Sequence, residues 1–216
     1  MTNMFRSRGV AAFAAAALCL NAAWAGGLET LDAFVKNVKS GRATFTQSVT
    51  APAKDGQAVR AKVSSGSFEF VRPNRFKFIY KKPFEQSIVA DGQTLWLYDV
   101  DLAQVTARKQ AAALGSTPAA LISAAPDLKA LQAEYTLTDA PAADGQEWLQ
   151  ATPKSKEGSL QNVRVGFKGG MLATLEILDS FGQRSVLQFS AFEANAVIEP
   201  GSFQFKPPAG VDVVRQ

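Results

Sequence analysis

Apolar residues near the start of the chain follow the spacing of an amphipathic helix. They fall three and four positions apart between residues 28 and 38, so that they share one helical face. A Ser-Gly pair follows at 40–41, and glycine commonly ends a helix. The pattern therefore predicts one helix over 28–39, whose apolar face carries Leu28, Leu31, Phe34, Val35 and Val38.

From residue 42 onward most segments alternate between apolar and polar residues, which is the period of a β-strand. Pairs such as Asp91-Gly92 and Gly169-Gly170 separate several of these segments and are typical of hairpin turns. The predicted strands cover 42–50, 58–64, 67–71, 75–80, 86–90, 94–100, 134–138, 147–153, 161–167, 171–179 and 184–192, and the stretch 202–214 closes the chain.

The alternation breaks in the middle of the chain, where two short helices are predicted. Thr117 can cap a helix that begins at Pro118 and continues to Ile122, and a second helix is expected over 127–131. The whole pattern favours a mainly β protein of one domain, built on a single strongly curved, barrel-like antiparallel sheet. Because helices are few, the sheet must curl around its own apolar face or use these helices as a plug.

The stretch SFEFVRPNRFKFIY, residues 67–80, concentrates aromatic side chains on one face of two predicted strands. Residues of one parity share a face in extended chain. By parity alone the rings fit both an ordinary core and the lining of a cavity. One arginine belongs to the same row, and Pro73 after it favours an extended conformation at that residue. The row consists of Phe68, Phe70, Arg72, Phe76, Phe78 and Tyr80.

The N-terminal residues have the features of a secretory signal peptide. Arg6 and Arg8 precede an apolar run over 10–20, and small residues at Ala23 and Ala25 form a cleavage site. We expect the general secretory (Sec) route and cleavage after Ala25, with a signal peptide over 1–25 and the mature domain over 26–216. A lipoprotein signal ending at Cys19 is the alternative, but Leu18 stands where a small residue is expected.

Composition excludes several classes of enzyme. The 216 residues contain no histidine and one cysteine, which the expected cleavage removes, so neither catalytic triads with histidine nor His/Cys metal sites can form. No glycine-rich phosphate loop is present. Asp91, Asp99 and Asp101 could hold Ca²⁺ or form an acid/base pair, or could be acids at hairpin ends that face solvent. We expect a protein that is not an enzyme and needs no metal or cofactor.

A cluster of basic residues raises the question of nucleic acid. The chain carries a formal net charge of +4, and five cations are interleaved with the rings of 67–80 and just beyond. In strand-based readers of single-stranded nucleic acid the cations and rings share a face, whereas parity here puts most cations opposite the rings. We therefore expect no nucleic-acid partner, and either a solvated outer face or a patch that steers the protein to an acidic partner. The cations are Arg72, Arg75, Lys77, Lys81 and Lys82.

Several motifs together resemble the LolA family of periplasmic outer-membrane lipoprotein carriers. They are the run over 66–105 with its RP and DGQTLWLYD elements, FTQ at 45–47, STPAALI at 116–122 and FQFKPPAGVDVV at 203–214. The resemblance implies an incomplete, half-open β-barrel closed by an α-helical lid. It also implies a carrier without covalent chemistry. Such a carrier receives lipoproteins from an inner-membrane ABC transporter and passes them to the outer-membrane receptor LolB.

The resemblance also assigns roles to residues of this chain. Arg72 would be a latch that donates hydrogen bonds to backbone carbonyls of the lid. A monomer is expected. A periplasmic sensor or transporter of another amphiphile, built on a similar half-barrel, is the alternative function. The implied lid residues are Leu31, Phe34, Val35, Val38, Ala119, Leu121 and Ile122, and the implied acyl-chain cavity is lined by Phe45, Phe68, Phe70, Phe76, Phe78 and Trp96.

Overall fold

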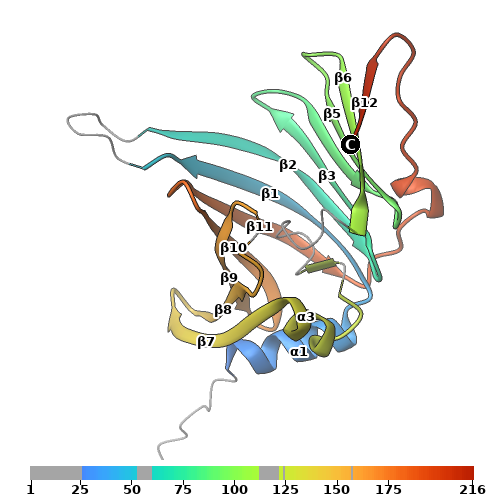
Figure 1. Cartoon of the computed structure of the whole chain (residues 1–216). Helices are drawn as coiled ribbons and strands as arrows, with labels where there is room; N and C mark the ends of the chain where they lie inside the picture. Colours follow the sequence, from blue (N-terminus) through green and yellow to red (C-terminus); the bar gives the residue numbers. More distant parts are fainter. Residues whose placement is uncertain (1–25, 53–59, 112–121, 124, 157) are drawn as a thin grey trace, which may run out of the picture.

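A computed structural model describes residues 26–52, 60–111, 122–123, 125–156 and 158–216 (Figure 1). Two α-helices and one short 3-10 helix accompany the strands in this part of the chain: α1 (Gly27–Asn37), α3 (Leu128–Glu134) and η2 (Pro200–Phe203). The strands are β1 (Ser40–Thr50), β2 (Ala61–Val71), β3 (Arg75–Lys82), β4 (Gln86–Ala90), β5 (Thr94–Asp99), β6 (Gln104–Lys109), β7 (Tyr135–Ala143), β8 (Gln146–Pro153), β9 (Leu160–Lys168), β10 (Met171–Asp179), β11 (Arg184–Ala194) and β12 (Asp212–Arg215).

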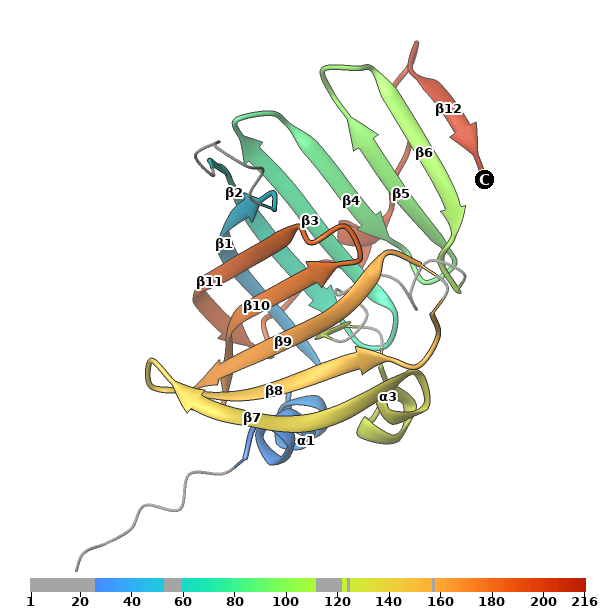
Figure 2. The same cartoon turned by 60° about the vertical axis from the view of Figure 1, so that its left-hand side comes forward.

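All strands belong to one sheet in the order β12-β6-β5-β4-β3-β2-β1-β11-β10-β9-β8-β7. The sheet is strongly curled, and its two edge strands, β12 and β7, do not pair with each other (Figures 1 and 2). The expected half-open, curved sheet is thus confirmed. One feature differs from the purely antiparallel expectation, because the C-terminal strand β12 joins β6 in parallel register.

Several predicted elements have different limits in the structure. The single strand β2 covers 61–71 and so joins the predicted segment 67–71 to the described end of the segment 58–64. β6 was not predicted because its six residues include only two apolar side chains, Val105 and Ala107. Of the stretch 202–214, only 212–214 lie in a strand. α3 begins one residue later than expected, with Asp127 as its N-cap accepting from the Ala130 amide at 2.8 Å. The helix predicted at Pro118 lies outside the described residues except for Ile122.

The main hydrophobic core lies between the concave face of the sheet and helix α1. A smaller core lies on the outer face, where the C-terminal segment crosses the strands β3 to β6 (Figure 1). Val89, Val105 and Phe203 are buried there, although none of them belongs to the main core cluster. The sheet therefore buries apolar residues on both of its faces.

No helix in the described part of the chain combines the length and apolar character needed to cross a membrane.

A buried glutamine connects two of the hairpin turns. The Gln110 side chain is 1% exposed, donates to the Asn74 carbonyl at 2.6 Å and accepts from the Gly92 amide at 2.9 Å. Removing it would leave both backbone groups without their partner, and an unsatisfied buried polar group costs about 1–3 kcal/mol. We expect Gln110→Ala to lower the free energy of unfolding by about 2 kcal/mol in urea titrations. The exposed Gln132→Ala serves as the control and should change it by less than about 0.5 kcal/mol.

Candidate functional site

Five phenylalanine rings form a continuous wall on the concave face of β1, β2 and β3. The cross-strand register places Phe68 opposite Phe78 and Phe70 opposite Phe76, so parity put these four rings on one face correctly. The rings of Phe68 and Phe78 stack at 4.4 Å, and Phe45 meets Phe78 edge-on at 5.6 Å. None of the five is more than 5% exposed. We call these residues the aromatic wall: Phe45, Phe68, Phe70, Phe76 and Phe78.

Helix α1 packs mainly against β7, β8 and β9, and it meets one end of this wall with the side chains that its apolar spacing indicated. The Phe34 ring lies 6.4 Å from Phe70 and 5.5 Å from Phe167, and so bridges two distant parts of the curled sheet. Ile122 is 2% exposed and belongs to the same cluster. Ala119 and Leu121 lie outside the described residues. The structure thus brings the aromatic wall together with the predicted lid residues Leu31, Phe34, Val35, Val38 and Ile122.

Trp96 does not belong to this wall, so its prediction as a cavity residue is wrong. Its register partners are Val89 and Ala107, whereas Leu95 and Leu97 take the concave face of β5. The indole lies on the outer face, with its centroid 5.4 Å from the Phe205 ring. Its N–H donates to Asp91 at 3.0 Å.

Arg72 lies in the turn between β2 and β3, next to the end of α1, and is 9% exposed. Its Nε donates to the Val38 carbonyl at 2.9 Å, at the end of α1. Its Nη1 donates to the Ala125 carbonyl at 3.1 Å, in the segment that leads to α3. The guanidinium also lies over two rings, 5.6 Å from the Phe34 centroid and 5.3 Å from that of Phe70. One side chain of the β2–β3 turn therefore connects two separate segments, the end of α1 and the segment before α3.

The environment of this guanidinium is only partly favourable. Burial lowers the pKa of Arg72 to about 10, and among the described residues its Nη2 has no hydrogen-bond partner. A buried cation is costly unless it is fully paired. The stabilisation from the contacts that Arg72 makes is thus offset in part by desolvation, and their net contribution to stability is modest.

The other basic residues of this region have different surroundings. Lys77 pairs with Glu69 at 3.1 Å and donates to the Ser202 hydroxyl at 3.3 Å. Arg75 lies over the Phe203 ring at 5.9 Å. Both cations therefore lie under the C-terminal segment rather than on a free outer face. Lys81 and Lys82, at the end of β3, are exposed.

The three aspartates considered for metal binding do not form one cluster. Asp91 lies at the turn before β5, where its carboxylate accepts from the amides of Gln93 and Thr94 and from the Trp96 indole. Burial acts to raise the pKa of Asp91, but these hydrogen bonds outweigh it and lower the pKa. Asp99 and Asp101 lie at the other end of β5. Within the described residues no group of three or more acidic, His or Cys side chains could hold a metal ion.

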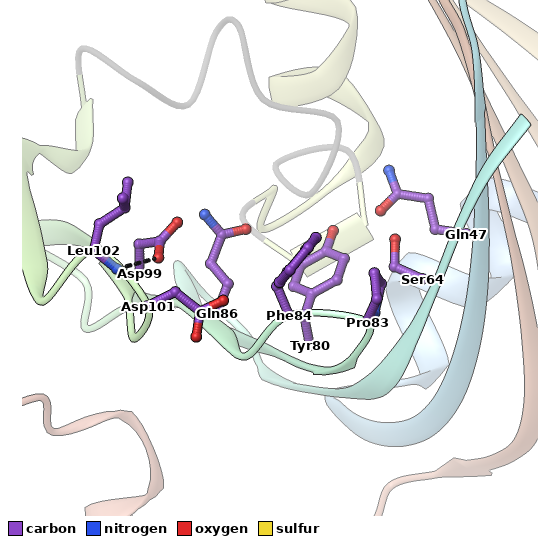
Figure 3. Close-up of a pocket in the computed structure, with 9 residues that line it drawn as sticks. All are labelled: Gln47, Ser64, Tyr80, Pro83, Phe84, Gln86, Asp99, Asp101 and Leu102. Carbon is purple, nitrogen blue, oxygen red and sulfur yellow. Dashed lines mark hydrogen bonds between the residues drawn. The ribbon is translucent and has the colours of Figure 1, made fainter.

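A groove of about 560 Å³ opens at the end of the concave face that lies away from Arg72. Figure 3 shows Gln47 and Ser64 on one side of it and Gln86 and Asp99 on the other, with the Tyr80 ring between them. Sequence reasoning missed this groove, although the parity of the wall, followed past its last ring, already places Gln47, Ser64 and Gln86 on the same face. The remaining lining residues are Pro83, Phe84, Asp101 and Leu102.

The phenol of Tyr80 makes the stability of this region sensitive to alkaline pH. Burial raises its pKa from 10.0 to about 12. Since the folded state holds the proton more tightly, the stabilisation is complete below pH 10 and is lost as the pH rises toward 12. We expect the free energy of unfolding of the wild type, relative to Tyr80→Phe, to fall by about 2 kcal/mol between pH 9 and 12. The titration of Arg72 in the same pH range affects both proteins equally and therefore cancels in this difference. A difference that does not change with pH would contradict the burial of this phenol.

Comparisons with known proteins agree with this architecture. The family model for the outer membrane lipoprotein carrier protein LolA matches residues 36–206. An outer-membrane lipoprotein carrier protein of Albidiferax ferrireducens is 69% identical over 93% of this chain and 98% of its own length. One of Methylibium petroleiphilum is 54% identical over 93% of this chain and 96% of its own.

Among solved structures, an uncharacterized conserved protein from Thermus thermophilus is 14% identical with a TM-score of 0.53. The match covers 87% of this chain and 98% of that one, and it supports the fold alone. The family model and the two close relatives together extend over nearly the whole chain. The chain belongs to the LolA family of outer-membrane lipoprotein carrier proteins.

Proposed function

We propose that this protein is a periplasmic carrier that binds the acyl chains of lipoproteins and moves them to the outer membrane. The observation that carries the proposal is the aromatic wall, a broad apolar surface whose cover is attached through Arg72. Such a surface has no directional groups and suits flexible hydrocarbon chains better than a ligand of fixed shape. The two close relatives named as outer-membrane lipoprotein carriers support the same assignment.

The free energy of burying an acyl chain determines which step of transport is difficult. Each buried methylene contributes about 0.8 kcal/mol, so a fully buried 16-carbon chain is worth on the order of 12 kcal/mol. Water is the alternative environment, and even partial burial keeps the cargo from aggregating. Release is then the harder step, because binding of this strength must be reversed at the receptor.

The lid supplies a force that opposes binding. In the empty protein the apolar face of α1 shares one core with the wall and meets it at Phe70, so acyl chains that enter this core must displace that face. Hydrogen bonds from a charged donor contribute roughly 1.5–3 kcal/mol each, which is small compared with the burial of one acyl chain. We propose a closed empty state, held by Arg72, and an open loaded state. Closure then helps to expel the cargo when the receptor offers an alternative site.

We propose the route that membership of the family implies. The chain is exported by the Sec route, its signal peptide is cleaved after Ala25, and it acts in the periplasm as a monomer without enzymatic activity. It receives lipoproteins from an inner-membrane ABC transporter and delivers them to LolB. The exposed Lys81 and Lys82 are candidates for steering it to a partner.

A reconstituted release assay tests this function. Membrane vesicles that contain the transporter and a labelled lipoprotein are incubated with the purified mature protein and ATP. We expect the label to appear in the soluble fraction in a stoichiometric complex with the carrier, and to move to LolB-containing vesicles afterwards. No soluble label at micromolar carrier would contradict the proposal. An amphiphile sensor would instead retain free lipid and release no lipoprotein.

A further inference from the structure

The groove at the open end of the concave face continues the aromatic wall but differs from it in chemistry. The Tyr80 ring meets Phe45 edge-on at 5.0 Å and so forms the boundary between wall and groove. Beyond it, the positions that face the same side are Gln47, Ser64 and Gln86, which are polar. An acyl chain that lies on the wall with its end leaving the protein would pass through this groove.

The polar groups of the groove are free to bind a ligand. Within the described residues, the hydroxyls of Ser64 and Tyr80 and the amide of Gln86 have no hydrogen-bond partner. Gln47 uses one amide hydrogen to donate to the Ser185 hydroxyl at 2.6 Å and keeps its carbonyl oxygen and its second hydrogen. These groups are neutral, and all of them can donate. They match neutral acceptors such as the carbonyl oxygens of esters and amides.

The charged residues that line the groove have one sign, and Lys81 and Lys82, which follow Tyr80 on β3, are not among them. Asp99 and Asp101 line it, and no lysine or arginine is among its lining residues (Figure 3). Asp99 also accepts from the Leu102 amide at 3.0 Å, which fixes the turn that carries both carboxylates. An anionic group in this groove would therefore meet like charges and find no cation among the lining residues, whereas a neutral group would meet no such repulsion.

We propose that this groove holds the neutral ester and amide linkages of the lipid anchor, and that Asp99 and Asp101 exclude lipids with an anionic phosphate headgroup. This inference rests on the proposed function of the wall. It addresses a problem that the wall itself cannot solve, because phospholipids carry the same acyl chains as the cargo and are far more abundant in a membrane. Selectivity must then come from the groups next to the chains.

The test uses two probes that differ only in the headgroup. Dioctanoylglycerol and dioctanoylphosphatidylglycerol are titrated separately into the mature protein, each displacing a fluorescent fatty-acid probe. We expect the wild type to bind the neutral lipid at least about tenfold more tightly. The double variant Asp99→Asn, Asp101→Asn should bind the anionic lipid about tenfold more tightly than the wild type does, with the neutral lipid changed by less than about twofold.

A matched control neutralises an aspartate elsewhere. Asp144 lies in the β7–β8 turn, near the opposite edge of the sheet, and its positive φ of 54° is one that asparagine also tolerates. Asp144→Asn should leave both affinities unchanged. Equal binding of the two lipids by the wild type, or unchanged discrimination in the Asp99/Asp101 variant, would overturn the inference. Failure of the wild type to bind either lipid would instead count against the proposed function as a whole.

A second variant tests the neutral groups. Tyr80→Phe combined with Gln86→Leu removes a hydroxyl and an amide from the groove and leaves the aromatic wall in place. We expect this variant to bind dioctanoylglycerol about tenfold more weakly, and to bind hexadecane, which has no linkage groups, as well as the wild type does. An equal loss for both ligands would show that the groove acts only as apolar surface and would overturn its assignment to the linkages.

Discussion

Replacing Arg72 by leucine is expected to leave loading intact and to slow the transfer of cargo to LolB by at least about tenfold. The substitution removes the hydrogen bonds to the Val38 and Ala125 carbonyls, and with them the force that closes the lid on the empty wall. Because closing no longer competes with the cargo, loaded protein becomes more stable relative to empty protein. The measurement is the first-order rate of lipoprotein transfer to receptor vesicles.

Two controls keep this experiment specific. Arg215 is exposed on β12, and its register partner Ala107 lies on the outer face with Trp96. Arg215→Leu therefore removes a charge on the side away from the described lid residues, and its transfer rate should equal that of the wild type. The unfolding free energy of Arg72→Leu should stay within about 2 kcal/mol of the wild type, since the lost bonds are offset by relief from burying a cation. Transfer by Arg72→Leu at the wild-type rate would contradict the latch.

Replacing Phe34 by alanine is expected to show whether α1 is a movable lid or a fixed part of the core. The ring packs against Phe70, Phe167 and Phe192, and Phe→Ala in a core costs about 3–5 kcal/mol of stability. If α1 is a lid, part of that cost falls on the closed state alone. A loss of about 1.4 kcal/mol in the closing free energy would raise the apparent affinity for an acyl probe about tenfold.

Phe203 offers the matched comparison. It is as buried as Phe34, at 3% exposure, but lies under the outer face of the sheet. Phe203→Ala should lower the free energy of unfolding by a similar amount and leave the affinity for the acyl probe unchanged. The two variants thus remove equally buried rings from the two cores, so that a difference in acyl affinity between them does not come from the loss of stability alone. An affinity that falls or does not move in Phe34→Ala would mean that α1 is a fixed part of the fold.

Parity predicted the aromatic wall because the strands β2 and β3 are regular and joined by a short turn. The same rule could not place Trp96, which stands between two leucines in a strand that is covered on both faces. Deciding which face is concave required knowing that the C-terminal segment crosses the outside. That crossing is a long-range contact, and no local pattern in β5 encodes it.

The site was predicted unevenly for related reasons. The helical spacing of α1 identified its buried face directly, since an amphipathic helix must bury one side. The backbone carbonyl partners of Arg72 were predicted from the family resemblance, because every residue has a backbone carbonyl and no side-chain pattern identifies the one that accepts. The polar groove was missed because glutamine and serine on a strand usually face solvent, and only the curvature of the sheet brings Gln47 and Gln86 to one space.

The central claim is that the concave face binds the acyl chains of lipoproteins, and the material that the protein carries in the periplasm tests it most directly. The mature protein is purified from periplasm without detergent and analysed intact by mass spectrometry, with Arg72→Leu in parallel to trap cargo. The account predicts complexes with triacylated lipoproteins at one cargo per carrier, enriched in the variant. Recovery of the protein with free lipid alone, in both wild type and variant, would contradict it.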